Sequence, residues 1–222
     1  AIRTAADKVQ QTLRGANLFG LVNNAGVAVA GPLLHLPIDE LRRQFEVNLF
    51  GLLAVTQAFA PLLGARKNAP KPCGRIVNIS SVSGRIAYPF VGPYAMSKHA
   101  LEALSDSLRR ELLLYGVDVI VIGPGAVRTP IWDKAEQLDV HAYAATDYVP
   151  VLAKMQKTLV RQGQRGMPAQ RVSAVIRTAL ESPRPKARYA LPDRPISGWL
   201  LPRWLPVRWL DRLIGNFLGM KP

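Results

Sequence analysis

Cysteine is almost missing from this 222-residue sequence, and long apolar runs are missing altogether. The single Cys73 excludes an intrachain disulfide, favours a reducing compartment, and is interpreted as a small hydrophobic residue rather than a catalytic thiol. A run of about 18 apolar residues without charge or proline, which a membrane-spanning helix requires, does not occur. We therefore expect a cytoplasmic protein, with peripheral contact to a membrane surface as a further option.

Acidic residues are scarce as well: 15 Asp and Glu stand against 29 Lys and Arg, a net charge of +14. The last 69 residues hold 14 Lys or Arg and three acidic residues. Such a basic segment is either a solvated face or a binding surface for an anionic partner. No RNP-like aromatic strand or zinc-ligand spacing accompanies it, so we expect neither a specific nucleic acid nor a metal.

Strand-length apolar runs alternate with longer segments of helical period. The expected strands are Leu18–Asn23, Arg75–Ser80, Val117–Ile122 and Ala187–Leu191. The expected helices are Asp39–Leu63, capped by Asp39, Pro93–Tyr115, ended by Gly116, and Pro168–Glu181. This alternation predicts an α/β fold with a doubly wound, Rossmann-type parallel sheet in one domain spanning residues 1–222.

A glycine-rich turn of the form G-x-G-x-x-G, which holds the phosphates of a dinucleotide, is missing from the sequence. The stretch "NNAG" at residues 23–26 supplies one glycine. In "GPGAVR", Arg128 takes the place of the last glycine and Pro124 removes a backbone donor. Neither stretch is therefore a phosphate loop.

Three other stretches bring chemically useful side chains to predictable places. In "YAMSK", Tyr94 and Lys98 are four residues apart on a predicted helix and so share one face. Ser81 follows a predicted strand, at the edge of a parallel sheet where ligands bind. Asn48 lies inside a predicted helix, where asparagine is a poor helix former, so a polar task is expected for it.

Taken together, "NNAG", "VNLFG", "NISSVSG", "YAMSK" and "PGAVRTP" resemble, in order and spacing, the short-chain dehydrogenase/reductase family between about residues 16 and 190. The resemblance implies NAD or NADP as cofactor and a catalytic set of Asn48, Ser81, Tyr94 and Lys98. The implied cofactor contacts are Asn23, Ala25, Gly26, Tyr94, Lys98, Pro124, Gly125, Val127 and Thr129. Gly123 stands where close relatives often have Glu, a departure that we interpret as neutral.

The chemistry of these residue types fits hydride transfer. A free phenol has a pKa of about 10 and is a poor base at neutral pH. We expect Tyr94 to be the acid/base, with the Lys98 ammonium lowering its pKa. Ser81 is expected to hydrogen-bond the substrate oxygen, and Asn48, by the resemblance, to hold a water that relays protons.

Two segments frame the expected substrate. Residues 131–167 occupy the place of the family's substrate-covering segment, and their apolar side chains suggest a pocket wall: Ile131, Trp132, Leu138, Tyr143, Tyr148, Val149 and Leu152. The basic, Trp- and Leu-rich C-terminal tail (residues 196–222) resembles that of members acting on retinoids, steroids and other lipid-like alcohols. It either lies on a membrane surface or packs over the substrate mouth or a subunit interface.

We therefore expect an oxidoreductase acting on a hydrophobic secondary alcohol or ketone, with a homo-oligomer implied by the resemblance. The alternative is a non-catalytic basic scaffold or membrane-surface protein with the same fold. In the family, three strands and the glycine-rich turn precede the strand "LFGLVN". We therefore expect these residues to be the carboxyl-terminal part of a longer enzyme, and alone to bind neither NAD nor NADP usefully.

Overall fold

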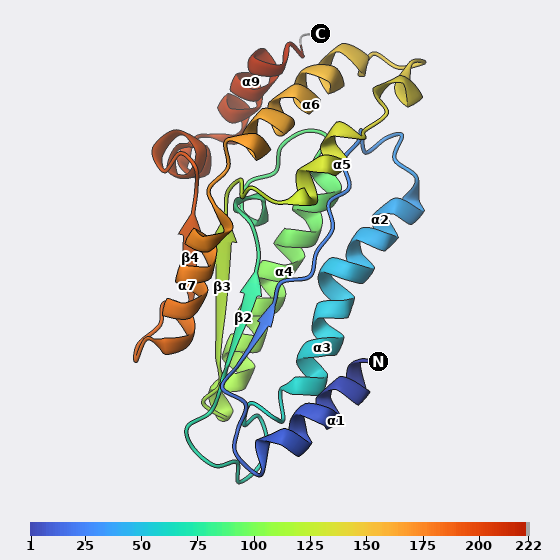
Figure 1. Cartoon of the computed structure of the whole chain (residues 1–222). Helices are drawn as coiled ribbons and strands as arrows, with labels where there is room; N and C mark the ends of the chain where they lie inside the picture. The colour runs from blue at the N-terminus through green and yellow to red at the C-terminus, as the bar shows by residue number, and fades with distance from the viewer. Residues whose placement is uncertain (221–222) are drawn as a thin grey trace.

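Four parallel strands lie side by side in chain order in the computed structural model, which describes residues 1–220 except the side chains of residues 134 and 135 (Figure 1). They are β1 (Gly20–Asn23), β2 (Arg75–Ile79), β3 (Asp118–Pro124) and β4 (Arg188–Leu191). Their bounds lie within a few residues of the predicted ones, and the α/β fold with a parallel sheet is confirmed. Strands rich in Val and Ile form here because β-branched side chains suit a sheet that is covered on both faces.

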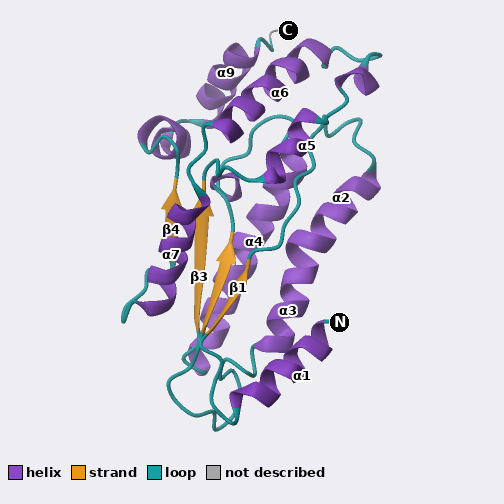
Figure 2. Ribbon diagram, viewed as in Figure 1, coloured by secondary structure: helices purple, strands orange, loops and turns teal. Residues whose placement is uncertain are grey.

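Helices cover both faces of the sheet (Figure 2). The α-helices are α1 (Ile2–Leu13), α2 (Ile38–Phe45), α3 (Leu52–Phe59), α4 (Gly92–Glu111), α5 (Asp133–Glu136), α6 (Val149–Gln164), α7 (Ala169–Glu181), α8 (Leu201–Trp204) and α9 (Val207–Leu218). Helices α3 and α4 contact β1 and β3, and α7 contacts β2 and β3.

Alternating side chains along the strands divide the core between the two faces. Ile76 and Val119 pack with Leu63 and Leu112 on one face. Their neighbours in sequence, among them Ile120, belong to a second cluster with α7 on the other face. A third cluster, built from α6, α9 and the segment around residue 90, lies beyond the carboxyl ends of the strands.

The predicted helix Asp39–Leu63 differs from the observed structure in two respects. Its N-cap is Pro37, so the cap predicted at Asp39 is wrong; Asp39 lies in the first turn and pairs with Arg42 at 2.8 Å. A π-helical turn, η1 (Glu46–Gly51), separates α2 from α3. The predicted stop at Gly116 is confirmed, because its φ of +73° lies in the left-handed region that favours glycine.

A chain of buried polar side chains crosses the sheet beneath the site. The Asn23 amide donates to Thr56 Oγ1 at 3.0 Å and to Asn78 Oδ1 at 2.9 Å. The Asn78 amide in turn donates to Ser105 Oγ at 2.9 Å, which ties β1 and β2 to α3 and α4. Buried amides are stable only when hydrogen-bonded, so these bonds fix the strands relative to the helices.

Replacing Asn23 by Ala should lower the free energy of unfolding by about 1–3 kcal/mol, because Asn78 Oδ1 loses its donor in a buried place. Asn24→Ala at the neighbouring exposed position is the matched control and should stay within about 0.5 kcal/mol of the native protein. Urea denaturation measures both values. Equal stabilities of the two variants would contradict this account of the buried chain.

Candidate active site

The ends of β2 and the start of α4 place three of the predicted catalytic residues. Ser81 follows β2 in extended conformation and caps the 3₁₀ turn η2 (Val82–Gly84), its Oγ accepting from the Ser83 amide at 3.1 Å. Proline at the start of α4 suits the first helical turn and sets the helix to begin just before Tyr94. Lys98 follows one turn later, as the spacing predicts.

The Ser81 hydroxyl is placed to stabilise the phenolate form of Tyr94 by hydrogen bonding. Burial raises the pKa of Tyr94 above its usual value, and Ser81 opposes this by stabilising the phenolate. The predicted lowering of the phenol pKa is therefore wrong for this structure. Lys98 Nζ lies 5.7 Å from the centre of the Tyr94 ring, but desolvation of the phenol dominates.

Lys98 is 5% exposed, and its Nζ donates to the Ile79 carbonyl at 2.9 Å. Burial lowers the pKa of Lys98 to about 8, while the charge of Glu102 opposes the shift. A lysine with this pKa changes its charge within the range in which enzymes work. The buried pair Tyr94–Lys98 can therefore hold and release protons at the edge of the sheet.

Asn48 lies in the π-helical turn η1, a local geometry that is often found at functional sites. Its Oδ1 accepts from the Val27 amide at 2.8 Å, and its Nδ2 donates to the Val27 carbonyl and to Ser97 Oγ, both at 3.0 Å. Asn48 thus ties the loop after β1 to α4. Both amide hydrogens are used, and one lone pair of Oδ1 remains.

The loop after β1 presents exposed backbone at Asn24, Ala25 and Gly26. A Cβ built at Gly26 would lie 3.4 Å from Asn48 Oδ1 and 3.8 Å from Lys98 Nζ, so this backbone borders the catalytic set. Asn23 differs from the prediction, because its side chain is buried in the polar chain under the sheet. Its side chain supports the site rather than lining it.

The segment that follows β3 carries the other predicted cofactor contacts. Gly125 donates to the Leu191 carbonyl at 2.8 Å, and Asp193 accepts from the Ala126 amide at 2.9 Å. The Val127 carbonyl accepts from the Trp132 indole at 2.7 Å. Pro124 is buried at the strand end, Gly125 and Val127 are half-buried, and Thr129 is exposed. These bonds fix the segment, and Thr129 faces open space.

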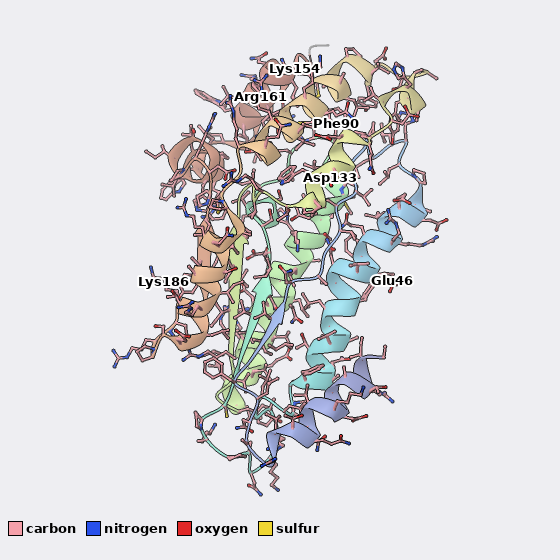
Figure 3. All side chains as sticks on the ribbon, in the orientation of Figure 1. Glu46, Phe90, Asp133, Lys154, Arg161 and Lys186 are labelled. Atoms are coloured by element: carbon pink, nitrogen blue, oxygen red, sulfur yellow. The ribbon has the colours of Figure 1, made fainter. Side chains whose placement is uncertain are left out.

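The expected substrate-covering segment lies above the strand ends. Leu152 is fully buried and packs with Phe90, Met155 and Leu218, so it belongs to the third core cluster rather than to a free wall. Phe90 and Tyr148 meet edge to face, with their ring centres 5.6 Å apart. In Figure 3, Phe90 lies below α6, at the same end of the molecule as Lys154 and Arg161. The strand edge is thus roofed by aromatic and aliphatic side chains.

Sequence reasoning missed an ionic cluster next to the catalytic set. Glu102, one turn beyond Lys98, pairs with Arg85 at 3.1 Å and with Arg188. A glutamate four residues after a candidate catalytic lysine shares its helix face, so its place near Lys98 could have been predicted from the sequence. Its arginine partners are distant in the sequence and could not. Among the described residues, no group of three His, Cys, Asp or Glu side chains could hold a metal ion.

Comparison with known proteins places this site in a family. The family model described as short chain dehydrogenase matches residues 1–139. The chain belongs to the short-chain dehydrogenase family. Over 213 residues it is 40% identical to an NADPH-dependent 3-dehydrocapnine reductase of Ornithobacterium rhinotracheale, covering 96% of this chain and 75% of the relative. It is 37% identical to human retinol dehydrogenase 5, with 95% of this chain and 66% of the relative covered.

A solved short-chain dehydrogenase from Streptomyces avermitilis superposes with a TM-score of 0.67 at 27% identity, covering 98% of this chain and 73% of that one. These matches show that the protein is an oxidoreductase of a family that uses NAD or NADP. The names of its relatives leave the choice between the two cofactors open. Of the glycines expected to contact such a cofactor, Gly26 lies next to Asn48 and Lys98, and Gly125 lies next to Asp193.

Lys98→Met removes an amine whose pKa burial lowers from its usual value of 10.5 to about 8. Below pH 8 the native protein carries the cost of a buried ammonium. Between pH 8 and 10.5 the unfolded chain binds more protons at this group than the folded one, so native stability relative to the variant should rise with pH, by about 2–3 kcal/mol in all. Urea denaturation across this range measures the difference, and a flat difference would contradict the burial assignment.

Proposed function

We propose that this short-chain dehydrogenase transfers a hydride between a nicotinamide cofactor and a hydrophobic secondary alcohol or ketone, with Tyr94 as the acid/base. The observation that carries the proposal is that Ser81, Tyr94 and the buried Lys98 amine lie together at one edge of the sheet, with Lys98 Nζ 5.7 Å from the centre of the Tyr94 ring. Sequence positions 48, 81, 94 and 98 converge on one sheet edge, which a non-catalytic scaffold would not require.

Each member of the set has a distinct task. Tyr94 gives a proton to, or takes one from, the substrate oxygen, and Ser81 stabilises the charge that develops there. Lys98 supplies positive charge beside the phenol when protonated. Asn48 Oδ1 and Lys98 Nζ both lie near Gly26, and the lone pair of Oδ1 that Val27 does not use is proposed to bind the relay water.

The residues proposed to hold the cofactor are the exposed backbone of Ala25 and Gly26, and Gly125, Val127 and Thr129 after β3. When bound, the nicotinamide supplies or accepts the hydride. Asn23 and Pro124, both buried, shape these two loops from below. The choice between NAD and NADP is a matter for titration of both cofactors.

The apolar roof supports a hydrophobic substrate. The third cluster brings aromatic and aliphatic side chains from residues 88–91, 138–159 and 214–220 over the strand edge. Apolar walls with few polar groups are typical of sites that bind hydrophobic small molecules. Two relatives have names consistent with lipid-like substrates, a 3-dehydrocapnine reductase and a retinol dehydrogenase. We therefore place the substrate class among lipid-, retinoid- or steroid-like alcohols and ketones.

In a form of the enzyme that turns over, Tyr94→Phe keeps the ring but removes the hydroxyl, and should lower kcat for the oxidation of hydrophobic secondary alcohols by at least about 100-fold. Affinity for the cofactor should change little, as isothermal titration would show. Tyr115→Phe removes a hydroxyl beyond the far end of α4 and is the matched control. Turnover by Tyr94→Phe close to that of the control would refute the acid/base assignment.

The C-terminal tail supports a second proposed function, contact with an anionic membrane surface. Among its described residues, Trp204 is 84% exposed and Trp209 is 62% exposed. Exposed arginines alternate with these rings at positions 203, 208 and 212. Exposed aromatic side chains interleaved with arginines suit the interface of an anionic bilayer. The described part of the chain contains no helix of the length and apolarity needed to cross a membrane.

The double variant Trp204→Ser/Trp209→Ser should weaken binding to phosphatidylserine-containing vesicles at least roughly tenfold, because two exposed rings no longer enter the interface. The control, Leu113→Ser/Leu114→Ser, removes exposed apolar side chains from the 3₁₀ turn Leu112–Leu114, which follows the C-terminal end of α4. It should bind the vesicles as the native protein does. Vesicle co-sedimentation measures all three proteins. Equal binding by both double variants would favour a tail that packs against another protein surface.

A further inference from the structure

A buried carboxylate lies one helical turn beyond the catalytic lysine. Glu102 is 4% exposed and shares the face of α4 that carries Lys98. A buried carboxylate is costly unless positive groups surround it. Its charge is also the one that acts on Lys98, where it opposes the loss of the proton.

Two guanidinium groups hold Glu102 from different elements. Arg85, at the end of η2, donates from Nε to Oε2 at 3.2 Å, and its Nη2 lies 3.1 Å from the same oxygen. Arg188, the first residue of β4, donates from Nη1 to Oε1 across 86 residues of sequence. Glu102 therefore joins the catalytic helix to the edge strand.

Gly123 makes room for this arginine. A Cβ built at position 123 would come 2.4 Å from Arg188 Nη2, so a side chain there would displace the guanidinium. The glycine that stands here is therefore not a neutral departure, as the sequence suggested. It leaves the space in which the Arg188 guanidinium lies against Glu102.

Arg188 is held on its other side by the beginning of the C-terminal tail. Its guanidinium lies 5.3 Å from the centre of the Trp199 ring, and that of Arg203 lies 4.8 Å from it. Trp199 is buried within η6 (Ile196–Leu200). Arg188 Nε and Nη2 are buried and have no hydrogen-bond partner in the described structure, so Glu102 and Trp199 fix its orientation.

The other charges around α4 are engaged elsewhere. On α4 itself, Asp106 accepts from Arg109 at 2.6 Å, with Arg85 4.0 Å away, and these arginines hold the pKa of Asp106 below its usual value. On the neighbouring elements, Arg75 pairs with Asp118 at the start of β3, α2 holds two exposed ion pairs, and Glu46 in η1 is exposed. Tyr94 is the other titratable group beside Lys98.

We propose that Glu102 is a positioning residue that, clamped by Arg85 and Arg188, couples the ammonium of Lys98 to Trp199 at the start of the C-terminal tail. The inference rests on the proposed function in so far as Lys98 is catalytic. Release of Arg188 from Trp199 leaves Glu102 less neutralised, and Lys98 then holds its proton more tightly. Loss of the Glu102 charge has the opposite effect, because two guanidinium groups remain near the ammonium.

The titration midpoint of Lys98 in the full protein tests this coupling without any turnover. Carbon-13 NMR of protein labelled at lysine Cε follows each amine against pH, and Lys98→Met identifies the resonance. The native midpoint should lie near 8. Glu102→Gln should lower it by roughly one unit, and Arg188→Met should raise it by roughly half a unit. Arg184→Met, an equal change of charge at an exposed position, is the control and should leave it unchanged.

Two further variants test the link to the tail and guard against loss of folding. Trp199→Leu should raise the midpoint toward that of Arg188→Met, whereas Trp199→Phe, which keeps a ring for the guanidinium, should stay near the native value. If Glu102→Gln does not fold, the double variant Glu102→Gln/Arg188→Met, which replaces the ion pair by two neutral side chains, is measured in its place. Its Lys98 midpoint should lie below that of Arg188→Met.

Midpoints that stay at the native value in the Glu102 and Arg188 variants, or that move in one direction together, would overturn the coupling. A normal response in those variants with no shift in Trp199→Leu would overturn the link to the tail. Turnover by Tyr94→Phe refutes the proposed function instead, so the two failures are told apart. A purely structural role for Glu102 would change unfolding without moving the midpoint of Lys98.

Discussion

Parallel pairing of the strands is the constraint on which the site depends. The register pairs Val22 with Val77 and Ile122 with Tyr189, so all four strands end at one edge of the sheet. The loops that carry Gly26, Ser81 and Gly125 leave from that edge. A slip of one residue would turn each strand's side chains to the other face and separate these loops from α4. The hydrophobic alternation of β2 and β3 therefore fixes the position of these loops relative to α4 as well as the packing of the core.

Desolvation sets the protonation of the two central residues. Burial raises the pKa of Tyr94 and lowers that of Lys98, so the phenol is protonated at neutral pH while the amine is close to its midpoint. A protonated phenol is the form that donates a proton to a carbonyl oxygen, as the reduction of a ketone requires. The opposite direction requires added positive charge beside the phenol, which a protonated Lys98 supplies, and the charge of Glu102 favours that protonated form.

Local sequence patterns were sufficient to predict the strands and the approach of the proposed catalytic residues to one another. Tyr94 and Lys98 come from one helix and Ser81 from a strand end, so their approach follows from period and topology alone. Asn23 and Asp39 show what such patterns do not predict. The side chain of Asn23 donates to the Asn78 amide oxygen on β2 and to the Thr56 hydroxyl on α3, and Asp39 lies in the first turn of a helix whose N-cap is Pro37. Periodicity says which residues are polar, but not which buried partner each one finds.

Long-range charge pairs escape sequence analysis for the same reason. Glu102 and Arg188 are 86 residues apart, and their contact needs a glycine at a third, unrelated position. The attraction between the two charges is strong only because the pair is buried, and burial is a property of the assembled sheet. Gly123 and Arg188 can be recognised as partners only after β3 and β4 are paired, where they lie two residues out of register on adjacent strands.

The C-terminal tail combines a buried start with an exposed remainder, and this division decides what an external surface can influence. Trp199 is buried against Arg188, whereas Trp204 and Trp209 project from α8 and α9. A surface that binds those exposed rings without displacing η6 leaves the Arg188–Glu102 pair intact. A surface that pulls η6 away frees Arg188 first, because Trp199 is one of its two supports, and the change then reaches Lys98 through a single carboxylate. The place on the tail at which a surface binds therefore determines whether binding changes the protonation of Lys98 on α4.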